Sequence, residues 1–299
     1  MKSTSFAVLY AAITLTTTAA PQLTKEEPSV SPTASSTLSR SGYAPVNGLQ
    51  MYYEIHGTPR ADVPPLVLLH GGGDTIETSF GVILPVLARG RQVIAFEQRG
   101  FGHTADPSDK PFGFEDSADD TAALLKYLQV GRADLFGFSN GGSIALQVAI
   151  RHPDVVRRLV ACTAIMKRAW VAAPFWEYMK TAEPATMPKV LSEAYLKVAP
   201  HPENLEPFFY KCRNRMRDFQ DVPDAPIQAI QAPTLVLSSD RDVMLPEGAI
   251  ALYRLLPHAQ LAILPGVDHM AICSQTDVLV PMLERFLASG EERPPSAPE

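Results

Sequence analysis

A serine flanked by glycines, Ser139 in the run Gly-Phe-Ser-Asn-Gly at 137–141, has the clearest chemical setting in this chain. An apolar segment at 133–136 precedes it, and a helix-like run at 143–150 follows. A serine in a tight strand-to-helix turn needs a positive φ and neighbours without bulky Cβ groups, which explains the glycines. Such a turn exposes the hydroxyl and directs the N–H of the next residue, Asn140, toward a reacting carbonyl. Ser139 is therefore the predicted nucleophile.

A serine hydroxyl needs a base that takes its proton and an acid that orients the base. In nucleophile-elbow proteins the acid and then the histidine follow the serine along the chain. Of seven histidines, only His269 both follows the serine and stands at the end of a predicted strand, 260–264, so it is the predicted base. His70 and His103 precede the serine; we interpret His70 as structural, and His103 as an alternative candidate near the mouth of the site.

The acid is expected just past the strand-like run at 234–237, where Asp240 and Asp242 are both candidates. Asp268 is a weaker third candidate, because it adjoins the predicted base and neighbours on an extended segment point opposite ways. Either of the first two could be only a turn former or a helix cap. Asp242 stands four residues before Pro246, which suits a loop that ends a strand and starts a helix. The residues alone leave both aspartates open.

A glycine run at 71–73 follows a continuous apolar segment, 65–69, of the kind expected of a strand buried on both faces. Glycine lets the backbone approach a bound carbonyl without a side chain in the way. The N–H groups of Gly72 and Asn140 are the predicted pair of oxyanion donors. Removing one such donor typically costs about 100- to 1,000-fold in rate. A plain glycine loop is the alternative interpretation.

Together these residues resemble the α/β-hydrolase superfamily, over about residues 42–288. The resemblance rests on four motifs: His-Gly-Gly-Gly at 70–73, Gln-Arg-Gly-Phe-Gly-His-Thr at 98–104, the elbow at Ser139, and the pair Asp242 and His269.

The resemblance implies that Asp242 is the acid, because its distance to Pro246 matches the family's acid loop. It also implies that Arg99 holds loops together rather than touching substrate. Proteins of this form are named hydrolases, esterases, enol-lactonases or non-haem haloperoxidases. A serine nucleophile argues against the haloalkane dehalogenase and epoxide hydrolase branches, which use aspartate there.

Strand-like and helix-like segments alternate along the chain, which predicts an α/β fold with a mostly parallel central sheet and helices on both faces. The segment at 42–57 is predicted to be an initial antiparallel hairpin. Further strands are predicted at 92–96 and 159–162, and helices are predicted at 117–128, 247–256 and 278–287.

The alternation breaks at about 167–224, which is helical, aromatic and interrupted by prolines. Because this interval lies between two predicted strands of the sheet, it predicts a small helical cap over Ser139. Most of its aromatic side chains should pack the cap onto the domain, and a minority should line an apolar pocket. We expect substitution of Trp176 or Phe209 to shift preference among acyl chains.

The N-terminal residues predict export. An apolar stretch at 6–15, which is too short to span a membrane, is followed by small residues. This pattern fits a signal peptide at 1–20 and predicts a secreted or periplasmic protein. A tail with accidental apolar content is the alternative. Residues 21–41 are predicted to be a Ser/Thr/Pro-rich linker, 42–289 the hydrolase domain, and 290–299 a flexible tail.

Composition limits the class of protein. The 299 residues are 46% hydrophobic and 19% charged, which indicates a globular chain that forms a core. A net charge of −6 gives no electrostatic footprint for nucleic acid. The one basic cluster, at 211–217, is followed by acidic residues, so we interpret it as a solvated helix face. Three cysteines permit one disulfide without specifying the pair: Cys162, Cys212 and Cys273.

The sequence therefore predicts a serine hydrolase that cleaves a small, fairly apolar ester or lactone through an acyl-enzyme on Ser139. The same triad could instead serve C–C bond hydrolysis, amide hydrolysis or perhydrolysis, and a ligand-binding protein without turnover is a further alternative. No metal or organic cofactor is implied, because no Cys/His cluster has ligand spacing and no phosphate-binding glycine motif opens a helix.

Overall fold

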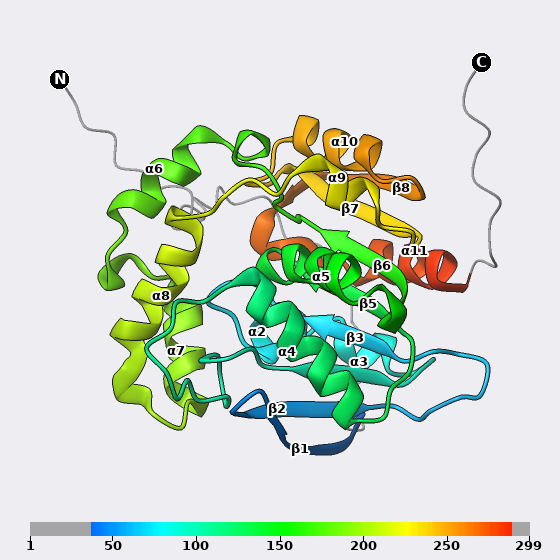
Figure 1. Ribbon diagram of the computed structural model, residues 1–299, viewed down its shortest axis with the longest axis horizontal. Coiled ribbons are helices and arrows are strands. Elements are labelled where there is room, and N and C mark those ends of the chain that lie inside the picture. The colour runs from blue at the N-terminus through cyan, green and yellow to red at the C-terminus, as the bar shows by residue number, and fades with distance from the viewer. Residues whose placement is uncertain (1–36, 289–299) are drawn as a thin grey trace, which may run out of the picture.

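The computed structural model describes residues 37–288, and these form one α/β unit (Figure 1). Its sheet has the strand order β1-β2-β4-β3-β5-β6-β7-β8. The first two pairings are antiparallel, and all others are parallel. The strands are β1 (Leu38–Val46), β2 (Leu49–His56), β3 (Leu66–Leu69), β4 (Val93–Phe96), β5 (Ala133–Phe138), β6 (Val156–Cys162), β7 (Thr234–Arg241) and β8 (Ala259–Asp268).

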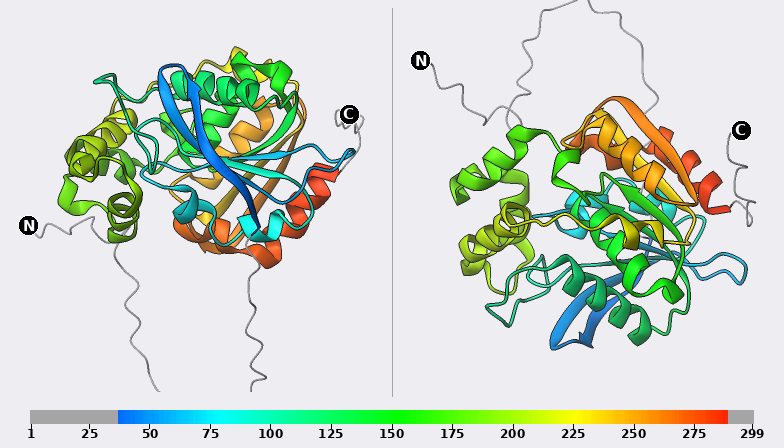
Figure 2. Two further views of the ribbon diagram at one scale, coloured as in Figure 1. Left: turned by 90° about the horizontal axis from the view of Figure 1, so that it is seen from below. Right: turned by 45° about the horizontal axis from the view of Figure 1, so that its top comes forward.

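Helices cover both faces of this sheet, which confirms the predicted fold class (Figures 1 and 2). Consecutive residues of β3 point to opposite faces, as strand geometry requires: Val67 and Leu69 join one apolar core, and Leu66 and Leu68 join the other. The first core includes α4 (Phe114–Tyr127), α5 (Asn140–Arg151), α9 (Asp224–Gln228) and α10 (Pro246–Leu255). The second includes α2 (Ile76–Phe80), α3 (Leu84–Leu87) and α11 (Thr276–Ala288).

The helical cap lies between β6 and β7 in the chain, as predicted, and forms the left-hand lobe of Figure 1. Its helices are α6 (Ala173–Thr181), α7 (Lys189–Val198) and α8 (Leu205–Arg217), with the short 3-10 turns η2 (Arg168–Trp170), η3 (Pro184–Thr186) and η4 (Pro202–Asn204). A cluster of buried aromatic side chains fixes the cap to the core: Phe101 and Phe112 from the core, and Tyr195 and Phe208 from the cap.

The boundaries differ from the prediction at the N-terminal side. Residues 38–41, predicted as the end of a linker, are strand, because β1 pairs with β2 from Leu38 onward. The predicted signal peptide (1–20), most of the linker and the tail (290–299) lie outside the described residues, so export stays a prediction. None of the described helices has the length and apolar character needed to cross a membrane.

Candidate active site

Ser139 occupies a strained turn between β5 and α5. Its φ of 55° lies in the left-handed region, which residues other than glycine rarely adopt, and such strain is concentrated at functional sites. The flanking glycines are needed sterically: a Cβ on Gly141 would collide with the carbonyl of Leu69, and one on Gly137 with the carbonyl of Gly141. The Ser139 N–H donates to the carbonyl of Cys162, 2.9 Å away, which fixes the turn on β6.

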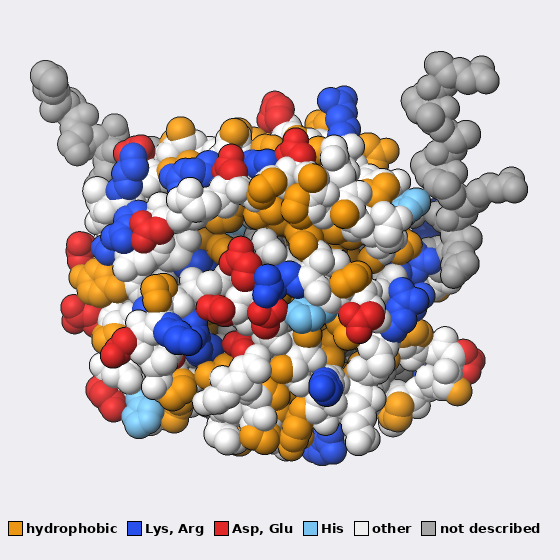
Figure 3. Space-filling view, in the orientation of Figure 1, with side chains coloured by type: hydrophobic (Ala, Val, Ile, Leu, Met, Phe, Trp, Pro, Cys, Tyr) orange, Lys and Arg blue, Asp and Glu red, His pale blue; other side chains and the backbone are white. Residues whose placement is uncertain are grey.

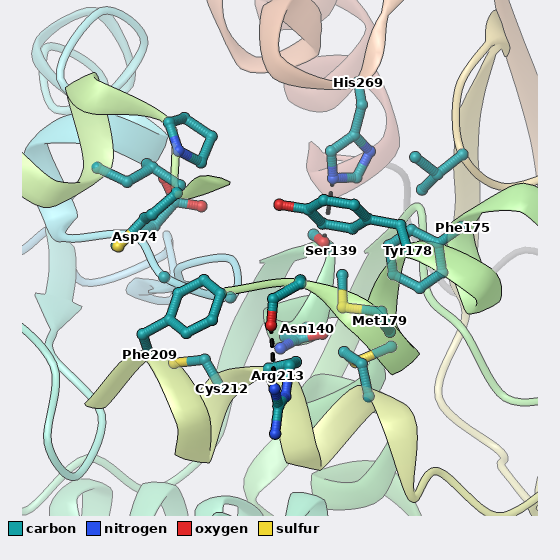
Figure 4. A pocket seen from close by; sticks show the side chains of 18 of the residues that line it. Asp74, Ser139, Asn140, Phe175, Tyr178, Met179, Phe209, Cys212, Arg213 and His269 are labelled. Atoms are coloured by element: carbon teal, nitrogen blue, oxygen red, sulfur yellow. Dashed lines mark hydrogen bonds between the residues drawn. The ribbon is translucent and has the colours of Figure 1, made fainter. Parts of the chain in front are cut away.

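The structure brings Ser139, His269 and Asp242 into one hydrogen-bonded chain (Figure 4 shows the first two). The Oγ of Ser139 is 3.1 Å from Nε2 of His269, and Nδ1 of His269 is 2.7 Å from Oδ1 of Asp242. Each residue directly follows the carboxyl end of a strand: β5, β8 and β7. Parallel strands gather their functional groups at this edge. With Nδ1–H donating to the carboxylate, Nε2 is free to take the serine proton.

For both Asp242 and His269, burial and the neighbouring opposite charge shift the side-chain pKa in opposite directions. Burial alone would lower the pKa of His269, but the adjacent Asp242 carboxylate and its hydrogen bond more than offset this, so the pKa is raised above 6.5. Burial would likewise raise the pKa of Asp242, but the charge of His269 and hydrogen bonds from His269 and Thr163 keep it below its usual range. The pair is therefore arranged to stabilise an imidazolium beside an ionised carboxylate.

The other candidates lie elsewhere. Oδ1 of Asp240 accepts the Gly266 N–H, and Oδ1 of Asp268 accepts the Ala271 N–H at the start of η5 (His269–Ser274), so both aspartates stabilise local turns. His103 interacts with Glu97 through Nδ1 and stacks on Tyr52. His70 is fully buried, accepts the Gln98 N–H and has its pKa lowered to about 4 by burial.

The loop of Gly72 lies against the nucleophile turn. A Cβ on Gly72 would collide with the side-chain amide of Asn140, so the close approach requires glycine at 72. Within the described residues, neither the N–H of Gly72 nor that of Asn140 donates to a protein acceptor. Both remain available for a bound oxygen. Arg99 donates to the carbonyl of Pro111, which agrees with the loop-holding role that the resemblance implied.

Thr163 is part of this arrangement and was not predicted. It directly follows β6, has a φ of 51°, and donates its hydroxyl to Oδ2 of Asp242 over 2.5 Å. The bond fixes the carboxylate from the side opposite His269. The rule that marked the other three residues, a polar group at the carboxyl end of a parallel strand, also applies to Thr163 and would have found it.

A cavity, partly open to solvent, lies over Ser139 between the core and the cap (Figure 4). Its lining is mostly apolar and comes largely from α6, α7 and α8. Asp74, directly after the glycine run, is the acidic residue among the lining side chains. The cap residues are Phe175, Tyr178, Met179, Ala182, Met187, Pro188, Leu191, Phe208, Phe209, Cys212, Arg213 and Met216. Trp176 is absent from this lining: it stacks on Phe219 and donates to the carbonyl of Arg168.

The basic cluster on α8 is not the solvated face that we expected. Arg215 is buried against phenylalanine rings and donates to Gln98, Gly113 and Ser117. Lys211 pairs with Asp106. On the face shown in Figure 3, basic and acidic side chains are interspersed. Arg217 alone of the four basic residues is exposed, where it pairs with Asp218. The prediction was wrong for the others because one side of the cap helix α8 packs against the core, which sequence neighbours do not reveal.

Comparison with known proteins identifies the family. The model of the α/β hydrolase fold family matches residues 64–211. A 2-hydroxy-6-oxo-2,4-heptadienoate hydrolase from Pseudomonas putida is 30% identical over 246 residues, covering 75% of this chain and 89% of the relative. The chain belongs to the α/β-hydrolase superfamily. A further superfamily member, a 2-hydroxymuconate semialdehyde hydrolase from a Pseudomonas species, is 28% identical over 248 residues, covering 76% of this chain and 88% of that protein.

Solved α/β-hydrolase structures agree in fold. An enol-lactonase from Burkholderia xenovorans superposes with a TM-score of 0.65 at 22% identity, covering 83% of this chain and all of its own. A meta-cleavage product hydrolase from Pseudomonas fluorescens superposes with a TM-score of 0.67 at 21% identity, covering 84% of this chain and 97% of its own. In the described part of this α/β hydrolase, no three His, Cys, Asp or Glu side chains are grouped to hold a metal ion. Its three cysteines are free thiols.

The raised pKa of His269 predicts the acid limb of the pH profile. As the predicted base, His269 would accept the serine proton only in its neutral form, so kcat/KM should increase with pH through a midpoint above 6.5, the ordinary histidine value. The measurement is kcat/KM for a neutral activated ester across the acid range. In Asp242→Asn the carboxylate charge is gone and burial dominates, so the midpoint of the residual activity should fall. A wild-type midpoint below 6.5 would contradict this account.

Proposed function

We propose that this α/β hydrolase is a serine hydrolase that cleaves a small, fairly apolar carboxylic ester or lactone through an acyl-enzyme on Ser139. The observation that carries the proposal is the hydrogen-bonded triad Ser139–His269–Asp242, of which Ser139 and His269 line a largely apolar cavity. Catalytic roles for these three residues are part of the proposal.

The proposed reaction has two stages. Oγ of Ser139 attacks the carbonyl while Nε2 of His269 takes its proton, and the N–H groups of Gly72 and Asn140 bind the oxyanion. His269 then gives the proton to the leaving alkoxide. In the second stage His269 activates water, which attacks the acyl-enzyme and releases the acid. Asp242, fixed by Thr163, holds the imidazole tautomer and stabilises the imidazolium in both stages.

The charges in the cavity favour a neutral substrate. Burial raises the pKa of Asp74 only to about 6, so its carboxyl is mostly ionised at neutral pH. The guanidinium of Arg213 already donates to the carbonyl of Ala182 and the side-chain oxygen of Asn214. A carboxylate on the substrate would therefore be repelled by the Asp74 carboxylate, and the Arg213 guanidinium is already hydrogen-bonded within the protein. A neutral ester or lactone avoids both.

C–C bond hydrolysis is the second candidate, because the two relatives reported above are named as hydrolases of dienoate and semialdehyde compounds. The same serine, base and oxyanion donors serve such a reaction, since the fold and the triad do not determine the substrate. The difference lies in the substrate, which for the first relative is named as a carboxylate.

A substrate panel separates the two candidates. We would measure kcat/KM for p-nitrophenyl esters of short, medium and long acids, for aliphatic lactones, and for a 2-hydroxy-6-oxo-dienoate. The proposal requires ester or lactone turnover that exceeds turnover of the dienoate. Preference for the dienoate would establish the second candidate, and absence of turnover on all three classes would leave a binding protein. Ser139→Ala is the control for background hydrolysis.

The cap is expected to determine acyl-chain preference without supplying the chemistry. Phe209 lines the cavity, so Phe209→Ala should change the ratio of kcat/KM between long and short esters. One methylene in an apolar pocket contributes about 1–3 kcal/mol, so the change should be roughly 10- to 200-fold.

Trp176→Ala is the matched control for this prediction. The indole is buried in the cap outside the cavity lining, with the Arg168 guanidinium 4.0 Å above its ring. Its loss should lower stability by about 3–5 kcal/mol and leave the chain-length ratio near the wild-type value. A folded Phe209→Ala protein with no turnover on any chain length would place the cap within the catalytic apparatus, against this proposal.

A further inference from the structure

Asp74 is a buried acidic side chain in the cavity to which the proposed reaction gives no role. It is 3% exposed, yet it lines the same cavity as Ser139 and His269. Figure 4 shows it across the cavity from Phe175, with Ser139 and His269 between them. A carboxylate among apolar side chains has lost hydration, which raises its free energy unless a partner compensates.

The protein supplies little of that compensation. Oδ1 of Asp74 accepts the Thr78 hydroxyl, 2.8 Å away, and the Ser79 hydroxyl is a weaker partner. No Lys, Arg or His side chain of the described chain forms an ion pair with Asp74, although the charge of His269, when protonated, favours the ionised carboxylate from a distance. Helix α2 does not need the carboxylate either, because Thr75 and Thr78 already cap its N-terminus reciprocally. The side chain is therefore not explained by packing, pairing or capping.

Its position also matters for the reaction. Asp74 stands two residues after Gly72, whose N–H is the proposed oxyanion donor, and its carboxylate lies against the backbone of Gly71. The negative charge there, which two hydroxyl groups compensate only in part, repels a developing oxyanion. A substrate group that donates a hydrogen bond to the carboxylate would offset this repulsion and orient the substrate at the same time.

We propose that Asp74 determines specificity: the preferred substrate carries a hydroxyl group near its scissile carbonyl, and this hydroxyl donates a hydrogen bond to the Asp74 carboxylate. The inference rests on the proposed function and narrows its substrate class to hydroxylated esters or lactones. The apolar cap side chains then contact the rest of the molecule, and the cavity holds one polar contact besides the reacting carbonyl.

Two matched ester pairs test this on the full-length protein, each differing only in the exchange of a hydroxyl for a methyl group. On the acyl side they are p-nitrophenyl β-hydroxybutyrate and p-nitrophenyl isovalerate. On the alcohol side they are glycol monobutyrate and propyl butyrate. A hydrogen bond to a charged group predicts that wild type favours the hydroxylated member of at least one pair by about 10- to 100-fold in kcat/KM.

The variants assign that preference to the carboxylate. Asp74→Leu, which removes both charge and acceptor, should reduce the ratio of that pair to about one, and Asp74→Asn should retain part of it. The matched control is Asp240→Asn, an exposed carboxylate outside the cavity, which should keep the wild-type ratio. A wild-type ratio near one in both pairs, or a ratio unchanged in Asp74→Leu, would overturn the inference. Absence of turnover on all four esters would overturn the proposed function instead.

A measurement on the wild type covers the case in which Asp74→Leu does not fold. Loss of the base by protonation of His269 affects both members of a pair equally, so this contribution cancels in the ratio. The charge of His269 also lowers the pKa of Asp74. The ratio should fall as pH is lowered through the pKa of Asp74, about 6, because the protonated carboxyl is a weaker acceptor. The other titratable or charged groups near it are His269, Cys273, Tyr178, Cys212 and Arg213; burial raises the pKa of Cys212 to about 12 and that of Cys273 further. A ratio independent of pH would contradict the role of Asp74.

Discussion

Ser139→Ala is expected to abolish covalent labelling by a fluorophosphonate and to lower kcat on an activated ester by about a million-fold, the loss seen when a triad serine is removed from a serine protease. The physical reason is that the variant has no oxygen 3.1 Å from Nε2 of His269, so no acyl-enzyme forms. The measurements are gel-based labelling and kcat on the folded variant.

Ser238→Ala provides a matched control. Ser238 is another buried serine, near the end of strand β7 in the same sheet, and its hydroxyl has no hydrogen-bond partner among the described residues. Its removal should leave labelling intact. Labelling that survives in Ser139→Ala at a different serine would disprove the assignment of the nucleophile.

Asp242→Asn is expected to lower kcat by about 10⁴-fold, because an amide in this place favours the wrong tautomer of the histidine. The carboxylate lies 2.7 Å from Nδ1 of His269 and holds its proton there. Asp240→Asn should lose far less, since Asp240 accepts the loop N–H of Gly266 and, among the described residues, has no hydrogen bond to His269. The measurement is kcat of both variants, with circular dichroism to check folding. The reverse ranking would show that the acid has been assigned to the wrong aspartate.

Much of the sheet could be predicted because its strands are short, apolar and separated by helical segments. Strand β8 shows where this reasoning stops. It was expected at 260–264, since Pro265 and Gly266 are strand breakers. In the structure β8 extends from Ala259 to Asp268, with Gly266 at a φ of 72° and an irregularity opposite it in β7. Pairing with a neighbouring strand extended it, and pairing is a tertiary property.

The residues of the candidate site also divide into those that the sequence pattern identified and those that only the fold revealed. The spacing of glycines selected Ser139, and strand ends selected His269 and Asp242. The strand-end rule also applies to Thr163, which directly follows β6. Neither pattern could identify Asp74, whose significance depends on which side chains the fold brings near it. Trp176 failed for a similar reason: an aromatic residue in the cap can face the cavity or the helices behind it, and only the packing of α6 decides between them.

Strand β8 is an edge strand of the sheet, and this position affects how the protein loses activity. An edge strand has a hydrogen-bonded neighbour on one side only, here β7, and many residues of β8 are half-buried or exposed. Such segments detach at a lower free energy than the whole domain unfolds. His269 begins the turn directly after this strand, whereas Ser139 follows a central one. Detachment of β8 would therefore separate base from nucleophile while most of the domain stays folded, so inactivation under mild heating precedes global unfolding.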